Sequence, residues 1–493
     1  MAKKRSDLQG IRGIAIVAVL LFHYFPKIFP NGYIGVDQFF VLSGYLMTMI
    51  FAGSKSSIIK SALSFYYRRV KRIIPLYLLV IVLVLMAVIV LLPPTFVLLN
   101  LESARAAALL YTNMATRSKE NQYFVQLNQA DDLFTHTWSL AVEFQFYLLV
   151  PFIFLIYQVD SNTFHWIVIL IIEAFSFTYY LVADPNVSFN SVFCRIWQFG
   201  IGIACYMISD LQNDSNESTK HEAPHNNDQK TGIVAQEDDT IEKKMLAVLS
   251  VVVTVLLIAL ALSTYPIPKD VLRPFTTLLT GIVIAVGSLT PCCILTLRAL
   301  VFLGDISYAL YLVHWPVFVL IRFYAPEKSS AYLFAISCCI AGATLLYYTF
   351  ERWYLSMTPG GIYILIAAMY AIIAVLILKG EDISNRLYEL RSGSSVNSDF
   401  VASRWTNMTI DEAIAVNEKF ARYEYKYLVA PHCQPNKTEH GFCSFEKQTL
   451  KGNLTILIIG NSYAANAAEL IYETFGRLAR NISKFSQSSK SSV

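Results

Sequence analysis

The sequence has little charge and no extended basic run. Charged residues make up 15% of its 493 positions, whereas an ordinary soluble domain has about 25%. The net charge of +4 is small, and no basic segment is interleaved with aromatic residues, so nothing indicates binding to nucleic acid. Hydrophobic residues make up 55% of the chain and come in blocks. The block from Ile73 to Leu92 contains no charged residue, and about twenty apolar residues can cross a bilayer as a helix.

The N-terminus lacks the small-x-small cleavage site of a secretory signal peptide. It begins with MAKKRSDLQG, and the apolar run that follows contains Arg12 and His23. We therefore expect a retained first membrane span and not a cleaved leader.

Hydropathy predicts about eleven membrane spans and hence an all-α integral membrane helix bundle. The approximate limits are residues 11–29, 33–53, 73–93, 141–159, 164–183, 191–209, 245–263, 272–290, 300–323, 331–350 and 361–379. Basic residues gather in segments 3–5 and 55–72, which predicts that both segments face the cytosol. An odd number of spans then places the chain after Leu378 on the lumenal or extracellular side of an endomembrane or the plasma membrane.

The polar segment 381–493 has the features of a lumenal or extracellular region. Cys433 and Cys443 form a candidate disulfide there, whereas the other six cysteines lie within or beside apolar blocks, as small hydrophobic residues do. Candidate glycosylation sequons occur at Asn407, Asn436, Asn453 and Asn481 in the tail and at Asn186 in an outer loop. These features indicate a membrane of the eukaryotic secretory route.

Several ionisable residues lie inside the expected spans, where each costs roughly 2.5–3.5 kcal/mol on insertion scales. They are Arg12, His23, Asp37, Glu143, Glu173, Arg195 and His314. Arg12 and His23 are eleven residues apart, so they share one helix face about 16 Å apart along the axis. Taken singly, each residue also fits a structural role, and for Glu173 we expect no other.

Their expected depths divide these residues into two groups. Arg12, Arg69 and Arg72 are predicted near the cytosolic side, where guanidinium groups would suit phosphates. Four titratable residues are predicted at a similar depth toward the outer side, where they would suit proton transfer: His23, Asp37, Glu143 and His314. The match in depth favours a functional interpretation.

A set of motifs occurs in order over residues 5–355. They are LQGIRGIAIVAVLLFHYFP, GYIGVDQFFVLSGYLM, FYYRRVKRIIPLY, HTWSLAVEFQFYLLVP, RIWQFGIG, LGDISYALYLVHWPVF and FERW. In this order and spacing the chain resembles transmembrane acyltransferase family three, and within it the nose-resistant-to-fluoxetine-like branch. The resemblance implies an acyltransferase domain over 1–355 and a final transmembrane helix over 356–380.

The resemblance also implies roles for individual residues. Arg12 and His23 match the essential pair of the family, and further motif residues are Asp37, Arg69, Arg72, Glu143 and His314. One position departs from the pattern, because Gln198 stands where the family usually has Glu. A neutral amide can keep a hydrogen bond, but it cannot act as a base.

The tail resembles the start of an SGNH-type domain, so the expected fold includes a partial α/β region over 381–493. Residues 454–459 predict a strand, and the GNSYA that follows would place Ser462 on a strand-to-helix turn as a possible nucleophile. Asn461 replaces the usual Asp, and the sequence ends about thirty residues later, before the expected Asp and His. We therefore expect an incomplete domain.

These observations lead to the hypothesis of a membrane-bound O-acyltransferase. Acyl-CoA, most simply acetyl-CoA, would place its phosphates near Arg12, Arg69 and Arg72 on the cytosolic side. His23, oriented by Asp37 or Glu143, would act as general base on a hydroxyl of a carbohydrate or lipid acceptor, or carry the acyl group transiently.

Two alternatives to this hypothesis stay open. A multi-pass transporter or lipid-handling protein would also keep charges inside the membrane, and a silent scaffold would only present the tail. Membrane lipid is an expected partner in every case, and no metal site is expected.

Overall fold

The computed structural model describes most of the chain up to residue 392 and parts of the tail. The described residues are 5–52, 58–115, 132–156, 162–221, 229–325, 329–392, 433–435, 442–445, 452–460, 468, 471–472, 474–475 and 478–486. Fifteen α-helices occur in them: α1 (Ser6–Tyr24), α2 (Ile34–Ala52), α3 (Ile58–Leu91), α4 (Pro94–Ala108), α5 (Thr112–Ala115), α7 (Trp138–Ile156), α8 (Asn162–Val182), α9 (Pro185–Asn190), α10 (Ile196–His221), α11 (Gln229–Leu262), α12 (Lys269–Leu289), α13 (Arg298–Tyr324), α14 (Ser329–Leu346), α15 (Arg352–Ser356) and α16 (Pro359–Ser392). Short 3₁₀ turns η1 (Thr135–Thr137) and η2 (Val192–Cys194) and a π-helical turn η3 (Tyr347–Glu351) complete the helical part.

The prediction of an all-α membrane bundle is confirmed. Nine helices of the described chain are long and apolar enough to cross a membrane: α1, α2, α3, α8, α11, α12, α13, α14 with its η3–α15 extension, and α16. The other two expected spans, 141–159 and 191–209, correspond to α7 and α10. The first span lies five residues earlier than the expected 11–29, since α1 begins at Ser6 and ends at Tyr24. Pro26 follows closely, and the residue before a proline disfavours helical backbone.

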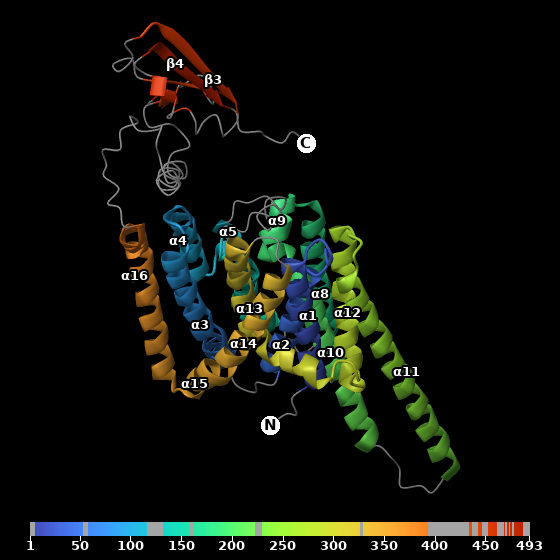
Figure 1. The fold of residues 1–493 in the computed structure, drawn as a ribbon. Coiled ribbons are helices and arrows are strands. Elements are labelled where there is room, and N and C mark those ends of the chain that lie inside the picture. Colours follow the sequence, from blue (N-terminus) through green and yellow to red (C-terminus); the bar gives the residue numbers. More distant parts are fainter. Residues whose placement is uncertain are drawn as a thin grey trace. The chain divides into compact units, whose positions relative to one another are not determined.

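The centre of the bundle is made by α1, α2, α10 and α13, which pack closely against one another (Figure 1). A Cβ atom on Gly304 of α13 would lie 1.9 Å from the carbonyl oxygen of Gln9 in α1. On the other side, a Cβ atom on Gly44 of α2 would lie 1.9 Å from the carbonyl oxygen of Phe199 in α10. Small residues at such crossings let two membrane helices approach backbone to backbone. These contacts fix the helices that carry most of the candidate site.

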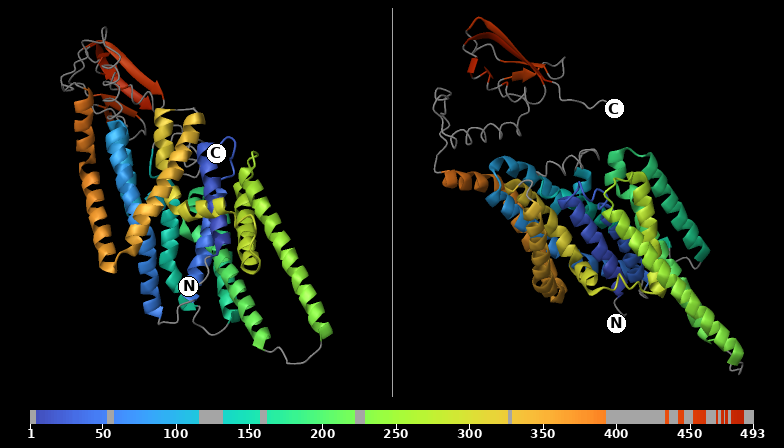
Figure 2. Two further views of the ribbon diagram at one scale, coloured as in Figure 1. Left: turned by 60° about the horizontal axis from the view of Figure 1, so that its bottom comes forward. Right: turned by 45° about the vertical axis from the view of Figure 1, so that its right-hand side comes forward.

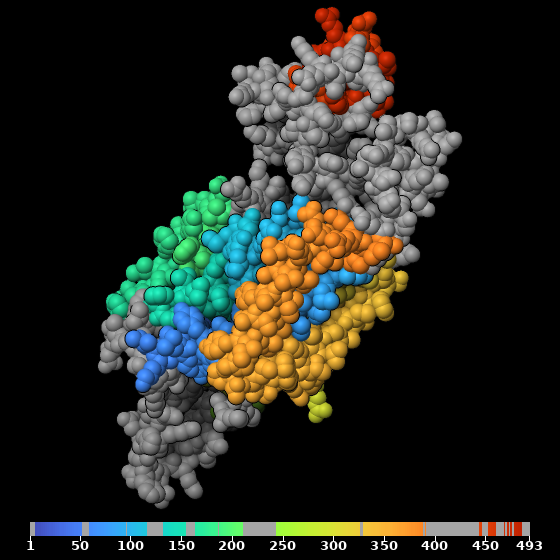
Figure 3. All heavy atoms as spheres, turned by 90° about the vertical axis from the view of Figure 1, so that its left-hand side faces the viewer, coloured from blue at the N-terminus to red at the C-terminus, as the bar shows by residue number. Residues whose placement is uncertain are grey.

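Peripheral helices surround this centre. In the most apolar part of α1, 72% of the residues are buried, compared with 17% in each of the spans Ser329–Ser356 and Pro359–Leu387. Figure 3 shows α16 lying on the outer face of the bundle, and Figure 2 shows α11 and α12 side by side in both views. The exposed faces of the peripheral helices are rich in large apolar side chains, such as Leu333 and Phe334 of α14 and Ile364 of α16. This is expected for surfaces that face lipid.

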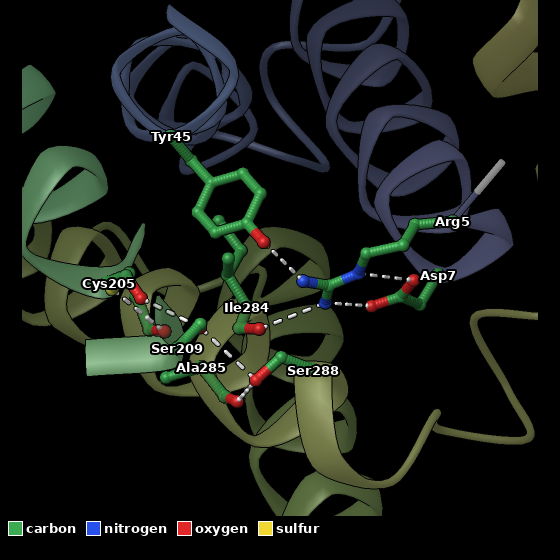
Figure 4. A network of polar contacts seen from close by, with 9 residues as sticks. Arg5, Asp7, Tyr45, Cys205, Ser209, Ile284, Ala285 and Ser288 are labelled. Atoms are coloured by element: carbon green, nitrogen blue, oxygen red, sulfur yellow. Dashed lines mark hydrogen bonds and ion pairs between the residues drawn. The ribbon is translucent and has the colours of Figure 1, made fainter. Parts of the chain in front are cut away.

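A polar network holds the start of α1 (Figure 4). Arg5 donates to both carboxylate oxygens of Asp7, at 3.2 and 2.5 Å, to the hydroxyl of Tyr45 at 2.7 Å and to the carbonyl of Ile284 at 3.0 Å. These contacts tie the first turn of α1 to α2 and α12. The same view shows Ser209 of α10 bonded to the neighbouring α12. Because Arg12 follows two turns after Arg5, the network also helps to fix its position.

The tail belongs to a second compact unit. The chain divides into residues 1–86 with 99–377 and residues 87–98 with 378–493. In the tail, β1 (Cys433–Pro435), β2 (Phe442–Phe445), β3 (Leu454–Gly460) and β4 (Ala479–Ser486) form a sheet in the order β1-β2-β4-β3. The β3–β4 pair is parallel, whereas the β1–β2 and β2–β4 pairs are antiparallel.

The sheet bears on two predictions for the tail, the strand over 454–459 and the Cys433–Cys443 disulfide. The strand predicted over 454–459 is present as β3, but the SGNH resemblance stays a prediction, because Ser462 lies outside the described residues. Cys443 is disulfide-bonded, and β1, which carries Cys433, is the antiparallel neighbour of its strand. The other six cysteines are free thiols.

Candidate active site

The first cavity of the bundle is a cleft of about 850 Å³, counting its open mouth, which we call the arginine cleft. Its charged lining comes from three helices: Arg12 of α1, Arg69 and Arg72 of α3, and Glu143 of α7. Arg69 and Arg72 are three residues apart, so they share one face of α3. The structure therefore brings together the three arginines that the sequence groups at one depth.

The charges of the arginine cleft are only partly compensated. Among the described residues, no carboxylate lies within ion-pair distance of the Arg12 or Arg69 guanidinium, whereas Arg72 pairs with Glu351 at 2.5 Å. All three arginines and Glu143 are half-buried. Partly exposed guanidinium groups with unused donors suit phosphate oxygens.

The second cavity, which we call the histidine chamber, has about 430 Å³ of space between atoms, counting its open mouth. Its ionisable lining residues are His23, Asp37, Arg195 and Arg273, and all four are buried. They come from α1, α2, the start of α10 and α12. The chamber adjoins the arginine cleft, because both cavities are lined by Val36 and Tyr311.

A chain of hydrogen bonds fixes His23 in the chamber. The carbonyl of Tyr311 can only accept, so His314 donates to it from Nδ1, at 2.6 Å. A neutral His314 then accepts at Nε2, which lies 3.0 Å from Nδ1 of His23. This network assigns the proton of His23 to Nδ1 and leaves the lone pair of Nε2 as a base. The helix contact between α1 and α13 is what makes this pairing possible.

Asp37 belongs to a separate buried cluster in the same chamber. Its Oδ1 accepts a hydrogen bond from Gln198 Nε2 at 2.8 Å and lies 3.6 Å from Arg195. Its Oδ2 lies 4.0 Å from Nε of Arg273. The amide of Gln198 thus keeps a hydrogen bond to Asp37.

The structure separates Glu143 from His23. Glu143 accepts short hydrogen bonds from Ser43 and Tyr147 and lines the arginine cleft. The four titratable groups expected at one depth therefore divide: His23 and Asp37 line the chamber, His314 is bonded to His23, and Glu143 lines the cleft. The hydrogen-bond partner that the structure gives His23 is a second imidazole, that of His314.

Sequence reasoning missed four residues that the structure brings to the site. Arg273 carried a signal, because it is a charge inside the expected span 272–290. His136, Tyr311 and Glu351 lie in quoted motifs but carried no signal of their own. The ring of His136 lies 5.7 Å from that of His314. Burial lowers the pKa of His136 well below its usual value, and the neighbouring His314 lowers it further.

The remaining candidate residues do not join this site. Glu173 is half-buried in α8 beside Gly200, where a Cβ atom would lie 2.7 Å from its carboxylate. Asn453 is exposed and Asn481 is half-buried in β4. Asn407 and Asn436 and the side chain of Asn186 lie outside the described part of the chain, so glycosylation stays a prediction. The described residues contain no cluster of three His, Cys, Asp or Glu that could hold a metal.

Comparison with known proteins places this geometry in a family. A family model described as an acyltransferase domain matches residues 5–350. The chain belongs to the acyltransferase 3 family. The match covers both cavities and each of their charged lining residues, and it stops short of α16 and the tail.

The curated relatives of this acyltransferase 3 protein align with a smaller part. It is 33% identical to the O-acetyltransferase OatA of Staphylococcus aureus strain NCTC 8325 over 147 residues, which are 30% of this chain and 24% of the relative. It is 32% identical to a putative O-acetyltransferase of S. aureus strain COL over 149 residues, with the same two shares. The chain thus spans about a quarter of the length of these relatives. No solved structure matches it.

Proposed function

We propose that this chain is a membrane-bound O-acyltransferase that moves an acyl group, most simply acetyl, from acyl-CoA to a hydroxyl of a carbohydrate or lipid acceptor. One observation carries the proposal: a histidine with an oriented free nitrogen lies in a chamber that adjoins a cleft lined by three arginines. The relatives named as O-acetyltransferases support the same class of reaction.

The two cavities divide the proposed reaction between them. The phosphates of the donor bind Arg12, Arg69 and Arg72, and its pantetheine arm carries the thioester toward the chamber. Nε2 of His23 takes the proton of the acceptor hydroxyl while the oxygen attacks the thioester carbonyl. The tetrahedral intermediate collapses, the C–S bond breaks, and His23 returns the proton to the departing sulfur. The products are an O-acyl ester and free CoA.

The chamber supplies orientation and charge stabilisation in this scheme. His314 holds the Nδ1 proton of His23 and can share the positive charge that develops on the imidazole. The Arg195 and Arg273 guanidinium groups line the same chamber and favour a developing oxyanion. The basic segments that flank the first spans support a cytosolic donor and an acceptor on the opposite side, with a lumenal or extracellular tail.

The test is acetyl-CoA binding and CoA release by purified protein in lipid nanodiscs, with mass analysis of sugar and lipid acceptors. Arg12→Ala is expected to lose binding, whereas His23→Ala keeps binding and loses turnover by roughly 10²- to 10⁴-fold. Arg105→Ala removes an exposed arginine outside both cavities and serves as the matched control. A folded His23→Ala protein with unchanged acyl transfer would refute the proposal, and solute flux without CoA release would support the transporter alternative.

A further inference from the structure

Two residues form the boundary between the cavities. Val36 of α2 and Tyr311 of α13 line both the arginine cleft and the histidine chamber, and every other described lining residue belongs to one cavity. An acyl group that passes from the arginines to His23 therefore passes between these two side chains. We call this pair the partition.

The Tyr311 side of the partition is held in place. Its hydroxyl donates to the carbonyl of His136 at 3.0 Å, and it lies 2.5 Å from the hydroxyl of Ser139, which therefore donates to it. The phenol is 7% exposed and packs against Phe39 with a ring separation of 6.4 Å. Swinging the ring aside would cost two hydrogen bonds between α13 and the η1–α7 segment, so Tyr311 forms a rigid wall on one side of the partition.

The same residue fixes the base. The backbone carbonyl of Tyr311 accepts the Nδ1 proton of His314, which orients His23. The wall and the catalytic nitrogen are thus tied to one turn of α13. An acyl group that passes the partition enters the histidine chamber, which His23 lines.

We infer that Val36 and Tyr311 determine the length of the acyl group that this protein transfers, and that they restrict the donor to short-chain acyl-CoA. The inference rests on the proposed function. Each additional methylene must pass the partition and fit among buried side chains that have little room to move. A pocket of this kind discriminates roughly 10- to 200-fold per methylene.

The experiment compares CoA release from acetyl-, butyryl- and hexanoyl-CoA in nanodiscs. In wild type, kcat/KM is expected to fall at least tenfold for each added methylene, and so by about 10⁴-fold or more from acetyl to hexanoyl. Tyr311→Ala opens the partition and is expected to raise the hexanoyl-to-acetyl ratio at least tenfold. Val36→Phe narrows it from the opposite helix, so acetyl-CoA binding should persist while turnover of every donor falls at least tenfold.

A matched control separates the partition from a general packing defect. Tyr77 of α3 is also buried, its hydroxyl also donates to a backbone carbonyl, and it lines neither cavity, so Tyr77→Ala should leave the ratio unchanged. Suppose that the hexanoyl-to-acetyl ratio is unchanged in Tyr311→Ala while wild type shows His23-dependent turnover. The partition would then not determine acyl length, but the proposed function would still stand. Absence of His23-dependent CoA release from every donor would instead overturn the proposed function.

Discussion

The arginine cleft and the histidine chamber lie next to each other, but they handle charge in different ways. In the chamber, Asp37 lies between two buried arginines, and each histidine proton has an acceptor. In the cleft, Arg12 and Arg69 are half-buried and have no carboxylate partner among the described residues. The difference teaches that the chamber offsets part of its buried charge with its own carboxylate, whereas two arginines of the cleft lack such a partner among the described residues.

The largest expected effect comes from breaking the internal compensation of the chamber. Asp37→Asn leaves Arg195 and Arg273 buried without their carboxylate, and removing one partner of a buried pair costs about 3–5 kcal/mol. We expect a large fall in the thermal unfolding temperature of the protein in nanodiscs. Glu143→Gln is the control in the half-buried cleft, where the loss should be small. Equal stability of the two variants would show that the cavities do not differ in this way.

The second expected effect concerns orientation of the base. His314→Ala removes the acceptor of the His23 Nδ1 proton, so kcat should fall by roughly 10²-fold while the KM for acetyl-CoA stays the same. His314→Gln keeps an amide oxygen that can accept this proton, and it should recover part of kcat. If KM rises instead and kcat is retained, His314 shapes the donor site and does not orient His23.

Much of this comparison could be predicted from the sequence. The spacing of Arg12 and His23 on one apolar helix, and that of Arg69 and Arg72 on another, depends only on helical periodicity. Because the flanking basic residues set a common direction, depth could be estimated before any contact was known. The membrane bundle and the grouping of the three arginines followed from these two rules.

What the sequence could not predict is which residues touch across helices. Depth alone put Glu143 beside His23, but α7 is rotated so that Glu143 meets Ser43 of α2. The pairing of His23 with His314 depends on the close crossing of α1 and α13, which Gly304 permits. Rotation about a helix axis and the choice of neighbour are set by packing, and hydropathy does not report either.

The third effect tests whether an arginine of the cleft that lacks a carboxylate partner binds the donor. Arg69→Ala removes a guanidinium that has no carboxylate partner among the described residues, so stability should change little while the Kd for acetyl-CoA rises about tenfold. This difference should shrink at high salt, because the cleft is open to solvent. Arg68 is the matched control, since it is the adjacent arginine on the exposed face of α3. Equal losses of acetyl-CoA affinity in Arg68→Ala and Arg69→Ala would show that the donor senses only the general positive potential of this region and does not bind Arg69 directly.

The smallest effect concerns the one arginine of the cleft that already has a partner. Glu351, on the π-helical turn η3, pairs with Arg72, whose side chain is 37% exposed. The side chain of Glu351 is 2% exposed. A donor phosphate must compete with this carboxylate, and a pair with one buried partner should lie near the upper end of the about 0.2–1 kcal/mol that exposed pairs are worth. Glu351→Gln should therefore tighten acetyl-CoA binding by up to roughly fivefold, measured as Kd beside an exposed control, Glu102→Gln. Weaker binding would mean that Glu351 positions Arg72 for the donor, so that the cleft, like the chamber, is preorganised by its own carboxylate.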